Sequence, residues 1–279
     1  MGAARAEVEA LNWYQTIDLG DGLVTPGMFD HRRLVKRLPL EASLAGKRCL
    51  DVGSSDGFWA FELCRRGAAE VVSVDLEDPA RQEWQGPAAS VEARRDRAQM
   101  TSGRWEAEAG RTRRAFELAR AALGAPVERR DLSIYDLSPQ AVGHFDLVFI
   151  GSLLLHLRDP VRALVAAASV TVGQLVVLEP VVLSLTLALP RTPLATLWRL
   201  DEPRWWTPNM AGLRRLVQAA GLEVVRMTGP HFQRFGAGFP RRPPRRLLRP
   251  RELVFWALVR QIGAPSACVV ARPAGRGGR

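Results

Sequence analysis

The sequence has few cysteines, few lysines and no long apolar run. The cysteine count argues against a disulfide-rich or zinc protein, and the short apolar runs argue against a membrane-spanning one. Three cysteines occur in 279 residues, at Cys49, Cys64 and Cys268, all inside apolar stretches and without metal-ligand spacing. An odd number of this kind argues against a disulfide framework and against a zinc site, and it favours a reducing, cytoplasmic environment. We therefore expect the three thiols to be packing residues.

The longest charge-free stretches are too short to cross a bilayer. Ala163–Leu178 and Val181–Pro190 are each shorter than the roughly 20 residues that a membrane-spanning helix needs. Their patterns are more typical of a buried helix and a buried strand. The first residues also lack the apolar core of a signal peptide, so we expect no membrane partner.

The positive charge is carried by arginine, because Lys36 and Lys47 are the only lysines. Residues 238–279 hold ten arginines and one acid, Glu252, and account for nearly all of the net charge of +10. Such a segment is typical of a solvated surface or of binding to a phosphate-rich partner such as RNA. Both interpretations stay open, and the Arg/Pro-rich stretch at about 238–251 is the candidate element for the second.

Short β-branched runs alternate with helical patterns, which predicts a parallel sheet flanked by helices. The expected strands are Arg48–Val52, Val71–Asp75, Val127–Asp131, Phe145–Gly151, Gln174–Glu179, Glu223–Thr228 and Ala267–Ala271. The expected helices lie near 56–67, 111–124 and 207–221, the last with Thr207 as its cap and Pro208 in its first turn. The predicted fold class is α/β, a Rossmann-like doubly wound sheet of about seven strands.

Two connections are longer than an α/β unit needs, at about 76–110 and about 180–206, and both are rich in tryptophan. Long insertions after strand ends are often lids or substrate walls. We expect residues 1–44 to form an N-terminal cover segment. Residues 45–279 then form one ligand-binding domain that carries both lid segments.

The stretch "LDVGSSDG" joins the first strand to a helix through small residues. It does not match the dinucleotide fingerprint, because serine stands where the second glycine belongs, and no Gly-Lys-Ser/Thr of a phosphate loop follows. Asp51 offers a carboxylate to an ammonium group, and Gly53 lets the backbone approach a ligand closely. The start of the helix can bind a carboxylate. A ligand with both groups is an amino acid.

Two more acids end the next two strands. An acid at the place of Asp75 commonly accepts from both ribose hydroxyls. Asp131 can accept from an adenine amine, with Leu132 beside the ring. Amino acid, ribose and adenine together describe S-adenosylmethionine (SAM). The predicted cofactor residues are Asp51, Gly53, Ser55, Gly57, Asp75, Asp131 and Leu132.

These motifs resemble those of the class I SAM-dependent methyltransferases, with "LDVGSSDG" as the first motif, Asp75 as the ribose acid and "FDLVFIGSLLLHLRDP" as the motif after the fourth strand. The resemblance covers about residues 45–272 and implies methyl transfer. More closely, "WYQTIDLGDGLVTPGMFDHR" and "WWTPNMAGLRRLVQAAG" are similar to the branch that contains the tRNA wobble-uridine carboxymethyltransferase.

We do not expect this chain to use the carboxylated SAM of that branch. The wobble-uridine enzyme grips the extra carboxylate of a carboxylated SAM with a lysine, a tyrosine and an arginine. The "WYQTIDL" stretch has no lysine, and the other two positions align with Leu155 and Ser266. A carboxylate facing Leu155 would be desolvated without a partner. We therefore expect ordinary methyl transfer from SAM.

Methyl transfer is an in-line displacement, so the protein mostly aligns the reactants and excludes water. A hydroxyl acceptor also loses a proton, which a general base assists. His156, after the fourth strand, and His31, in the cover segment, are the candidate bases. The predicted pocket aromatics are Trp13, Tyr14, Trp205 and Trp206.

Three functions remain open at this stage. The leading hypothesis is a SAM-dependent methyltransferase acting on a small-molecule acceptor at oxygen. The alternatives are a tRNA methyltransferase of the wobble-uridine type, which would use the Arg-rich region, and a SAM-binding protein without turnover. No pair of histidines or acids has metal-ligand spacing, so metal-assisted methylation is not expected.

Overall fold

The structure is a computed structural model that describes residues 2–78, 81–83, 105–198, 204–239, 257 and 260–274. Most of the predicted insertion at about 76–110 lies outside the described residues. So do residues 199–203 of the second insertion and nearly all of the Arg/Pro-rich stretch at about 238–251.

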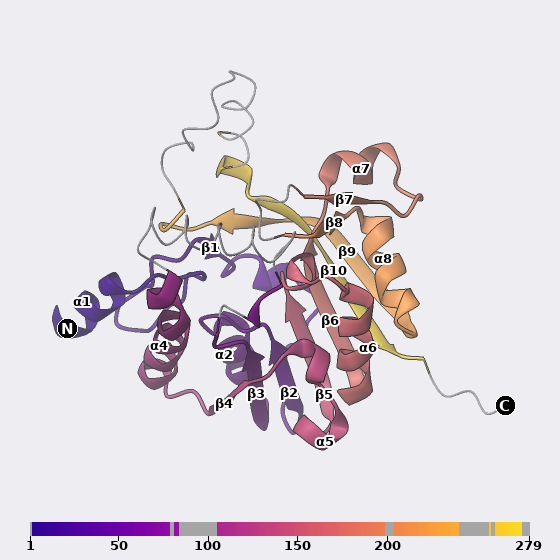
Figure 1. The fold of residues 1–279 in the computed structure, drawn as a ribbon. Helices are drawn as coiled ribbons and strands as arrows, with labels where there is room; N and C mark the ends of the chain where they lie inside the picture. The colour runs from indigo at the N-terminus through magenta and orange to yellow at the C-terminus, as the bar shows by residue number, and fades with distance from the viewer. Residues whose placement is uncertain are drawn as a thin grey trace.

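The described chain is built on one eight-stranded sheet with the order β1-β9-β10-β6-β5-β2-β3-β4 (Figure 1). Its strands are β1 (Phe29–Asp30), β2 (Arg48–Val52), β3 (Glu70–Asp75), β4 (Val127–Asp131), β5 (Phe145–Gly151), β6 (Thr171–Pro180), β9 (Leu222–Phe235) and β10 (Ala264–Pro273). The five from β2 to β6 pair in parallel, whereas β10 pairs antiparallel with β6 and β9. The sheet has more strands than predicted because β1 adds two residues to the end of β9.

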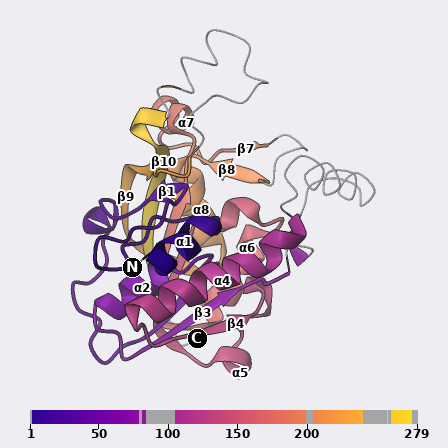
Figure 2. The ribbon, with the colours of Figure 1, turned by 90° about the vertical axis from the view of Figure 1, so that its left-hand side faces the viewer.

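Helices cover both faces of the sheet, as a doubly wound fold requires. The α-helices are α1 (Gly2–Ala10), α2 (Phe58–Arg65), α4 (Trp105–Leu123), α5 (Pro139–Val142), α6 (Pro160–Val170), α7 (Leu183–Ala188) and α8 (Met210–Ala219). One buried cluster unites α1, α2 and α4 with the sheet, and a second unites α6 and α8 with its other face. Figure 2 shows α1, α2 and α4 together on one side. A separate hairpin of β7 (Ala195–Leu197) and β8 (Trp206–Pro208) lies beside α8.

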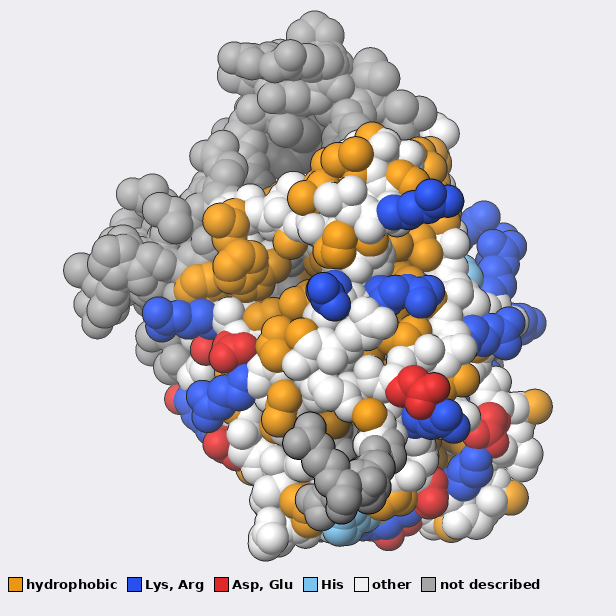
Figure 3. All heavy atoms as spheres, turned by 90° about the vertical axis from the view of Figure 1, so that its right-hand side faces the viewer, with side chains coloured by type: hydrophobic (Ala, Val, Ile, Leu, Met, Phe, Trp, Pro, Cys, Tyr) orange, Lys and Arg blue, Asp and Glu red, His pale blue; other side chains and the backbone are white. Residues whose placement is uncertain are grey.

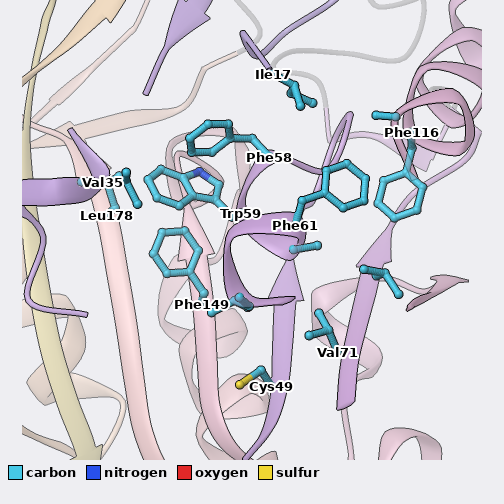
Figure 4. Close-up of a cluster of buried hydrophobic side chains, with 14 of the residues drawn as sticks. Ile17, Val35, Cys49, Phe58, Trp59, Phe61, Val71, Phe116, Phe149 and Leu178 are labelled. Atoms are coloured by element: carbon cyan, nitrogen blue, oxygen red, sulfur yellow. The ribbon is translucent and has the colours of Figure 1, made fainter. Parts of the chain in front are cut away.

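Aromatic side chains of α2 fill the first cluster (Figure 4). The ring centroids of Phe58 and Trp59 lie 5.0 Å apart, and those of Trp59 and Phe149 of β5 lie 4.5 Å apart. Phe61 meets Phe116 of α4 at 5.2 Å. These edge and tilted contacts fix α2, and with it the turn that precedes α2, against the sheet.

The predicted strands are confirmed, with β2, β4 and β5 at the expected bounds. The prediction for the strand at 223–228 was too short, because β9 continues to Phe235. The predicted cap of the last helix was wrong. Thr207 and Pro208 belong to β8, and Asn209 caps α8 by accepting from the amide of Gly212 at 2.8 Å.

The three cysteines are free thiols within the core, as expected. Cys49 and Cys268 are buried, and Cys64 is partly buried and packs against the first cluster. Across the described ranges, none of the helices is long and apolar enough to pass through a membrane.

Gly57 offers a direct test of the packing around the turn. It has φ +96°, and a Cβ there would lie 2.6 Å from Phe61 and 2.7 Å from Phe116. Gly67 has a similar φ of +82° with nothing within 4 Å. We expect Gly57→Ala to lower the free energy of unfolding by about 2–4 kcal/mol through strain and overpacking, and Gly67→Ala by only about 1 kcal/mol.

Urea denaturation of both variants checks this difference. Equal losses for the two variants would contradict the close packing of the turn against α2 and α4.

Candidate functional site

The turn after β2 is fixed by hydrogen bonds to the end of β3. The amide of Gly53 donates to the carbonyl of Val74 at 2.8 Å, and the amide of Ser55 donates to Oδ2 of Asp75 at 2.6 Å. Gly53 and Ser55 both have left-handed backbone, with φ of 74° and 51°. The Oδ1 atom of Asp75 accepts from the amide of Leu76 at 2.8 Å. Backbone amides therefore orient both carboxylate oxygens of Asp75.

Arg129 of β4 binds the same turn through its guanidinium group. Its Nη1 donates to the carbonyl of Ser55 at 2.7 Å and to Oγ of Ser54 at 3.1 Å. Its guanidinium covers the ring of Phe116 at 4.5 Å and lies 3.8 Å from Asp75. With 4% of its side chain exposed, Arg129 is a buried cation that supplies the counter-charge to Asp75.

Asp56 attaches the N-terminal segment to this turn. Its Oδ2 accepts from the amides of Tyr14 and Gln15, both at 2.8 Å. Oε1 of Gln15 in turn accepts from the amide of Phe58 at 3.0 Å and so caps the start of α2, which has no cap of its own. Asp56 is 1% exposed, and burial raises its pKa to about 7.

The loop after β5 lies beside the turn after β2, because β5 pairs with β2 and a Cβ on Gly53 would lie 2.9 Å from Leu153. The short 3-10 helix Leu154–His156 follows Ser152, whose amide donates to the carbonyl of Leu178 at 2.8 Å. The Oε1 atom of Glu179 accepts from the amides of Leu153 and Leu154 at 2.8 Å. Glu179 is 2% exposed, and burial raises its pKa to about 8. This acid therefore orders the loop that carries His156.

These elements line a cavity of about 610 Å³ at the carboxyl ends of the parallel strands. This edge is where open α/β sheets bind their ligands. The structure brings seven of the predicted site residues together around it: Gly53, Ser55, Asp75, Leu132, Trp13, Tyr14 and His156.

Three predicted cofactor residues are not among the described residues that line the cavity. Asp51 is buried, its Oδ2 accepts from the amide of Ala60 at 3.0 Å, and burial raises its pKa to about 8. Asp131 pairs with Arg81 at 2.8 Å on the surface. Gly57 packs under aromatic rings. The predicted contacts with the ammonium and the adenine amine stay predictions: Oδ1 of Asp51 has no hydrogen-bond partner in the described part of the chain, and the ion pair of Asp131 is exposed.

His31 lies behind the cavity rather than on its wall. It is 2% exposed, and its Nε2 lies 2.9 Å from Oε1 of Gln233. Burial lowers the pKa of His31 to about 4, so the ring is neutral at physiological pH. This placement does not support the expectation that His31 acts directly as a base.

Trp205 and Trp206 attach the second insertion to neighbouring loops. Neither is among the described residues that line the cavity. Nε1 of Trp205 donates to the carbonyl of Glu83 at 3.0 Å, and Nε1 of Trp206 donates to the carbonyl of Arg158 at 3.3 Å. Glu83 itself lines the cavity and accepts from the hydroxyl of Tyr135 at 2.8 Å. The two tryptophans thus support the wall that Glu83 and Tyr135 form.

Several residues of the site could not be recognised in the sequence, among them Asp56, Glu83, Arg129 and Ser152. Arg129 lies in "VERRD", which has the composition of a solvated strand, and only the alternation of the strand hints that its side chain turns inward. Asp56 was treated as a helix start. No local signal marks Ser152 or Glu83, because their partners are far along the chain. Within the ranges that the structure describes, no group of three His, Cys, Asp or Glu side chains could hold a metal ion.

The described residues fit a nucleoside at the ends of β3 and β4. A carboxylate has about four acceptor positions, and Asp75 uses two of them on backbone amides. Its side chain is 23% exposed on the cavity wall, so two positions remain for vicinal hydroxyls. Leu132 supplies apolar surface at the neighbouring strand end. A ribose on Asp75 and a ring on Leu132 are therefore compatible with this wall.

A comparison with protein families agrees with this geometry. Residues 29–227 match the model of a family described as a methyltransferase domain. No curated protein matches the chain in sequence.

Solved structures share the fold. One is a protein of Haloferax volcanii described as a methyltransferase, in complex with the Trm112 methyltransferase activator. It is 14% identical, with a TM-score of 0.52, and the match covers 100% of this chain and 97% of that one. Another is the N-terminal domain of EvdMO1 in the presence of S-adenosylhomocysteine (SAH) and D-fucose. It is 16% identical, with a TM-score of 0.51, and the match covers 98% and 96% of the two chains.

The raised pKa of Glu179 predicts a pH-dependent stability. Its folded-state pKa of about 8 lies above the ordinary value of 4.5, so the protonated form is favoured in the fold. The contribution of Glu179 is complete below pH 4.5 and is lost as pH rises towards 8. Glu179→Gln keeps the acceptor oxygen without the charge. We expect this variant to gain stability over the wild type from pH 5 to pH 8, by at most about 1.4 kcal/mol per pH unit.

Urea unfolding of both proteins at several pH values measures this difference. A difference that does not change with pH would contradict the burial of the Glu179 carboxyl.

Proposed function

The chain belongs to the methyltransferase-domain family, and we propose that this SAM-dependent methyltransferase transfers a methyl group to a hydroxyl oxygen of a small-molecule acceptor. The observation that carries the proposal is that one cavity of about 610 Å³ is lined both by His156 and by Asp75 and Leu132, which form its nucleoside wall. Its volume lies within the range of roughly 300–1,000 Å³ that is usual for small-molecule sites.

SAM supplies an electrophilic methyl group when it is bound. Asp75 would accept from the ribose hydroxyls, the backbone of Gly53 would approach the ligand, and Leu132 would contact the adenine. The turn that carries these contacts is already fixed by Arg129, so little ordering is needed on binding.

The N-terminal segment supports a small acceptor. Trp13 and Tyr14 line the cavity, and Asp56 holds the backbone of Tyr14 against the turn after β2. Burial, together with the charges of Glu179 and Asp56, raises the pKa of Tyr14, so its phenol stays protonated and can donate but not act as a base. Aromatic walls of this kind exclude water from the reacting atoms.

His156 is our candidate for the general base. It lies at the end of the 3-10 helix that Glu179 orders, and it lines the same cavity as Asp75. In this role the imidazole takes the hydroxyl proton of the acceptor as the oxygen bonds to the methyl carbon. The products are then a methyl ether and SAH.

An RNA acceptor is the second candidate, favoured by the ten arginines of residues 238–279. On the face shown in Figure 3, the described Lys and Arg side chains mix with Asp and Glu over the lower part, whereas those of the upper part and the right edge have no acid beside them. Eight of the ten arginines lie outside the described residues, so the cavity, and not the surface charge, is what favours the small-molecule proposal.

SAM with a labelled methyl group, incubated with the protein and an extract of its source organism, tests the proposal. We expect label in the small-molecule fraction and none above background in the RNA fraction. Label in RNA would overturn the small-molecule assignment. Binding of SAH without label in either fraction would indicate a SAM-binding protein that lacks turnover.

His156→Ala is the matched variant for this assay. Because a general base typically contributes about 10²–10⁴-fold, we expect transfer to fall by about that factor while the affinity for SAH changes less than twofold. Equal losses of transfer and affinity would make His156 a packing residue.

A further inference from the structure

Ser152 has an unusual backbone at a place that faces the cavity. It follows β5, lines the cavity and has φ of 54°, in the left-handed region that glycine prefers. Such a conformation is strained in a non-glycine residue. Glycine would relieve this strain but would lack the hydroxyl of Ser152, a residue that lines the cavity.

Gln233 and His31 orient this hydroxyl. Gln233 of β9 is 2% exposed, its Nε2 donates to Oγ of Ser152 at 3.2 Å, and its Oε1 lies 2.9 Å from Nε2 of His31. An amide oxygen only accepts, so His31 must donate from Nε2. The contact of Oε1 with His31 leaves Nε2 of Gln233 for Ser152.

The Ser152 hydroxyl therefore accepts a hydrogen bond from Gln233, and its own proton can be donated to a ligand. Oγ of Ser152 accepts from Gln233, and its own proton has only a 3.4 Å contact with Oε1, which His31 already occupies at 2.9 Å. A hydroxyl held in this way is a hydrogen-bond donor directed by the protein.

The sequence suggested the start of α2 as a carboxylate site, but most of its backbone amides already donate to acceptors within the protein. The amide of Gly57 donates to the carbonyl of Ser54 at 2.8 Å, and the amide of Phe58 donates to Gln15 at 3.0 Å. The amide of Ala60 donates to Asp51 at 3.0 Å. A ligand carboxylate at this end of the cavity therefore needs another donor.

The order of the strands places Ser152 at the end of the cavity where the amino-acid part of the ligand would lie. The nucleoside wall lies at the ends of β3 and β4, and the next strands along the sheet are β2 and β5. Gly53 follows β2, and Ser152 follows β5. The two loops meet, because a Cβ on Gly53 would lie 2.9 Å from Leu153. A ligand lying across these strand ends brings its non-nucleoside part to Ser152.

We propose that the Ser152 hydroxyl donates a hydrogen bond to the carboxylate at the amino-acid end of SAM, with Gln233 and His31 as positioning residues. The inference rests on the proposed function, because it assumes the same cofactor in the same cavity. It assigns His31 an indirect role, through Gln233, in place of the direct one expected from the sequence.

Ser152→Gly separates this role from a structural one. Titration calorimetry measures binding of SAH and of 5′-methylthioadenosine, which shares the nucleoside but has no amino-acid part. We expect the variant to bind SAH about tenfold more weakly, since a hydrogen bond to a charged group is lost, and to bind 5′-methylthioadenosine within twofold of the wild type. Its melting temperature should equal or exceed that of the wild type, because glycine relieves the left-handed backbone.

Gln233→Glu tests the positioning residues. A carboxylate at this position would accept the serine proton, so we expect SAH binding to fall at least as far as in Ser152→Gly and 5′-methylthioadenosine binding to stay unchanged. The double variant should be no weaker than Gln233→Glu alone, because both changes remove the same interaction. Leu132→Ala is the control at the nucleoside end, where both ligands should lose affinity together.

Equal losses of both ligands in Ser152→Gly, or no loss of SAH binding, would overturn the proposal. A wild-type protein that binds neither ligand would instead refute the proposed cofactor, and the inference would fail with it.

Discussion

The site depends on the hydrogen bond between the amide of Ser55 and the carboxylate of Asp75. At 2.6 Å it joins the turn after β2 to the end of β3. Arg129, buried beneath both, holds the carbonyl of Ser55 and balances the charge of Asp75. Because a partly buried carboxylate is unfavourable without such partners, the turn, the acid and the arginine form one unit that is ordered before a ligand arrives.

Buried acids elsewhere in the site organise loops. Asp56 holds the N-terminal segment through two amides, and Glu179 holds the loop before His156 in the same way. Burial raises the pKa of each, to about 7 and about 8. Both carboxyls therefore carry reduced negative charge at neutral pH, which suits a cavity that is proposed to admit a carboxylate near Ser152.

The parallel sheet could be predicted from the sequence, because apolar runs such as Phe145–Gly151 carry their own signal. Asp75 could be predicted because it ends such a run. Asp51 and Asp131 carry the same signal, yet their partners, Ala60 and Arg81, are visible only in the fold. The pairing of Ser152 with Gln233, 81 residues away, has no local signature at all.

The measurement that tests the central claim most directly is the affinity of Asp75→Ala for SAH by titration calorimetry. The account predicts a loss of at least about tenfold in a protein that stays folded by circular dichroism, since ribose hydroxyls would lose a charged acceptor. Unchanged affinity in the folded variant would contradict the placement of the nucleoside at the end of β3.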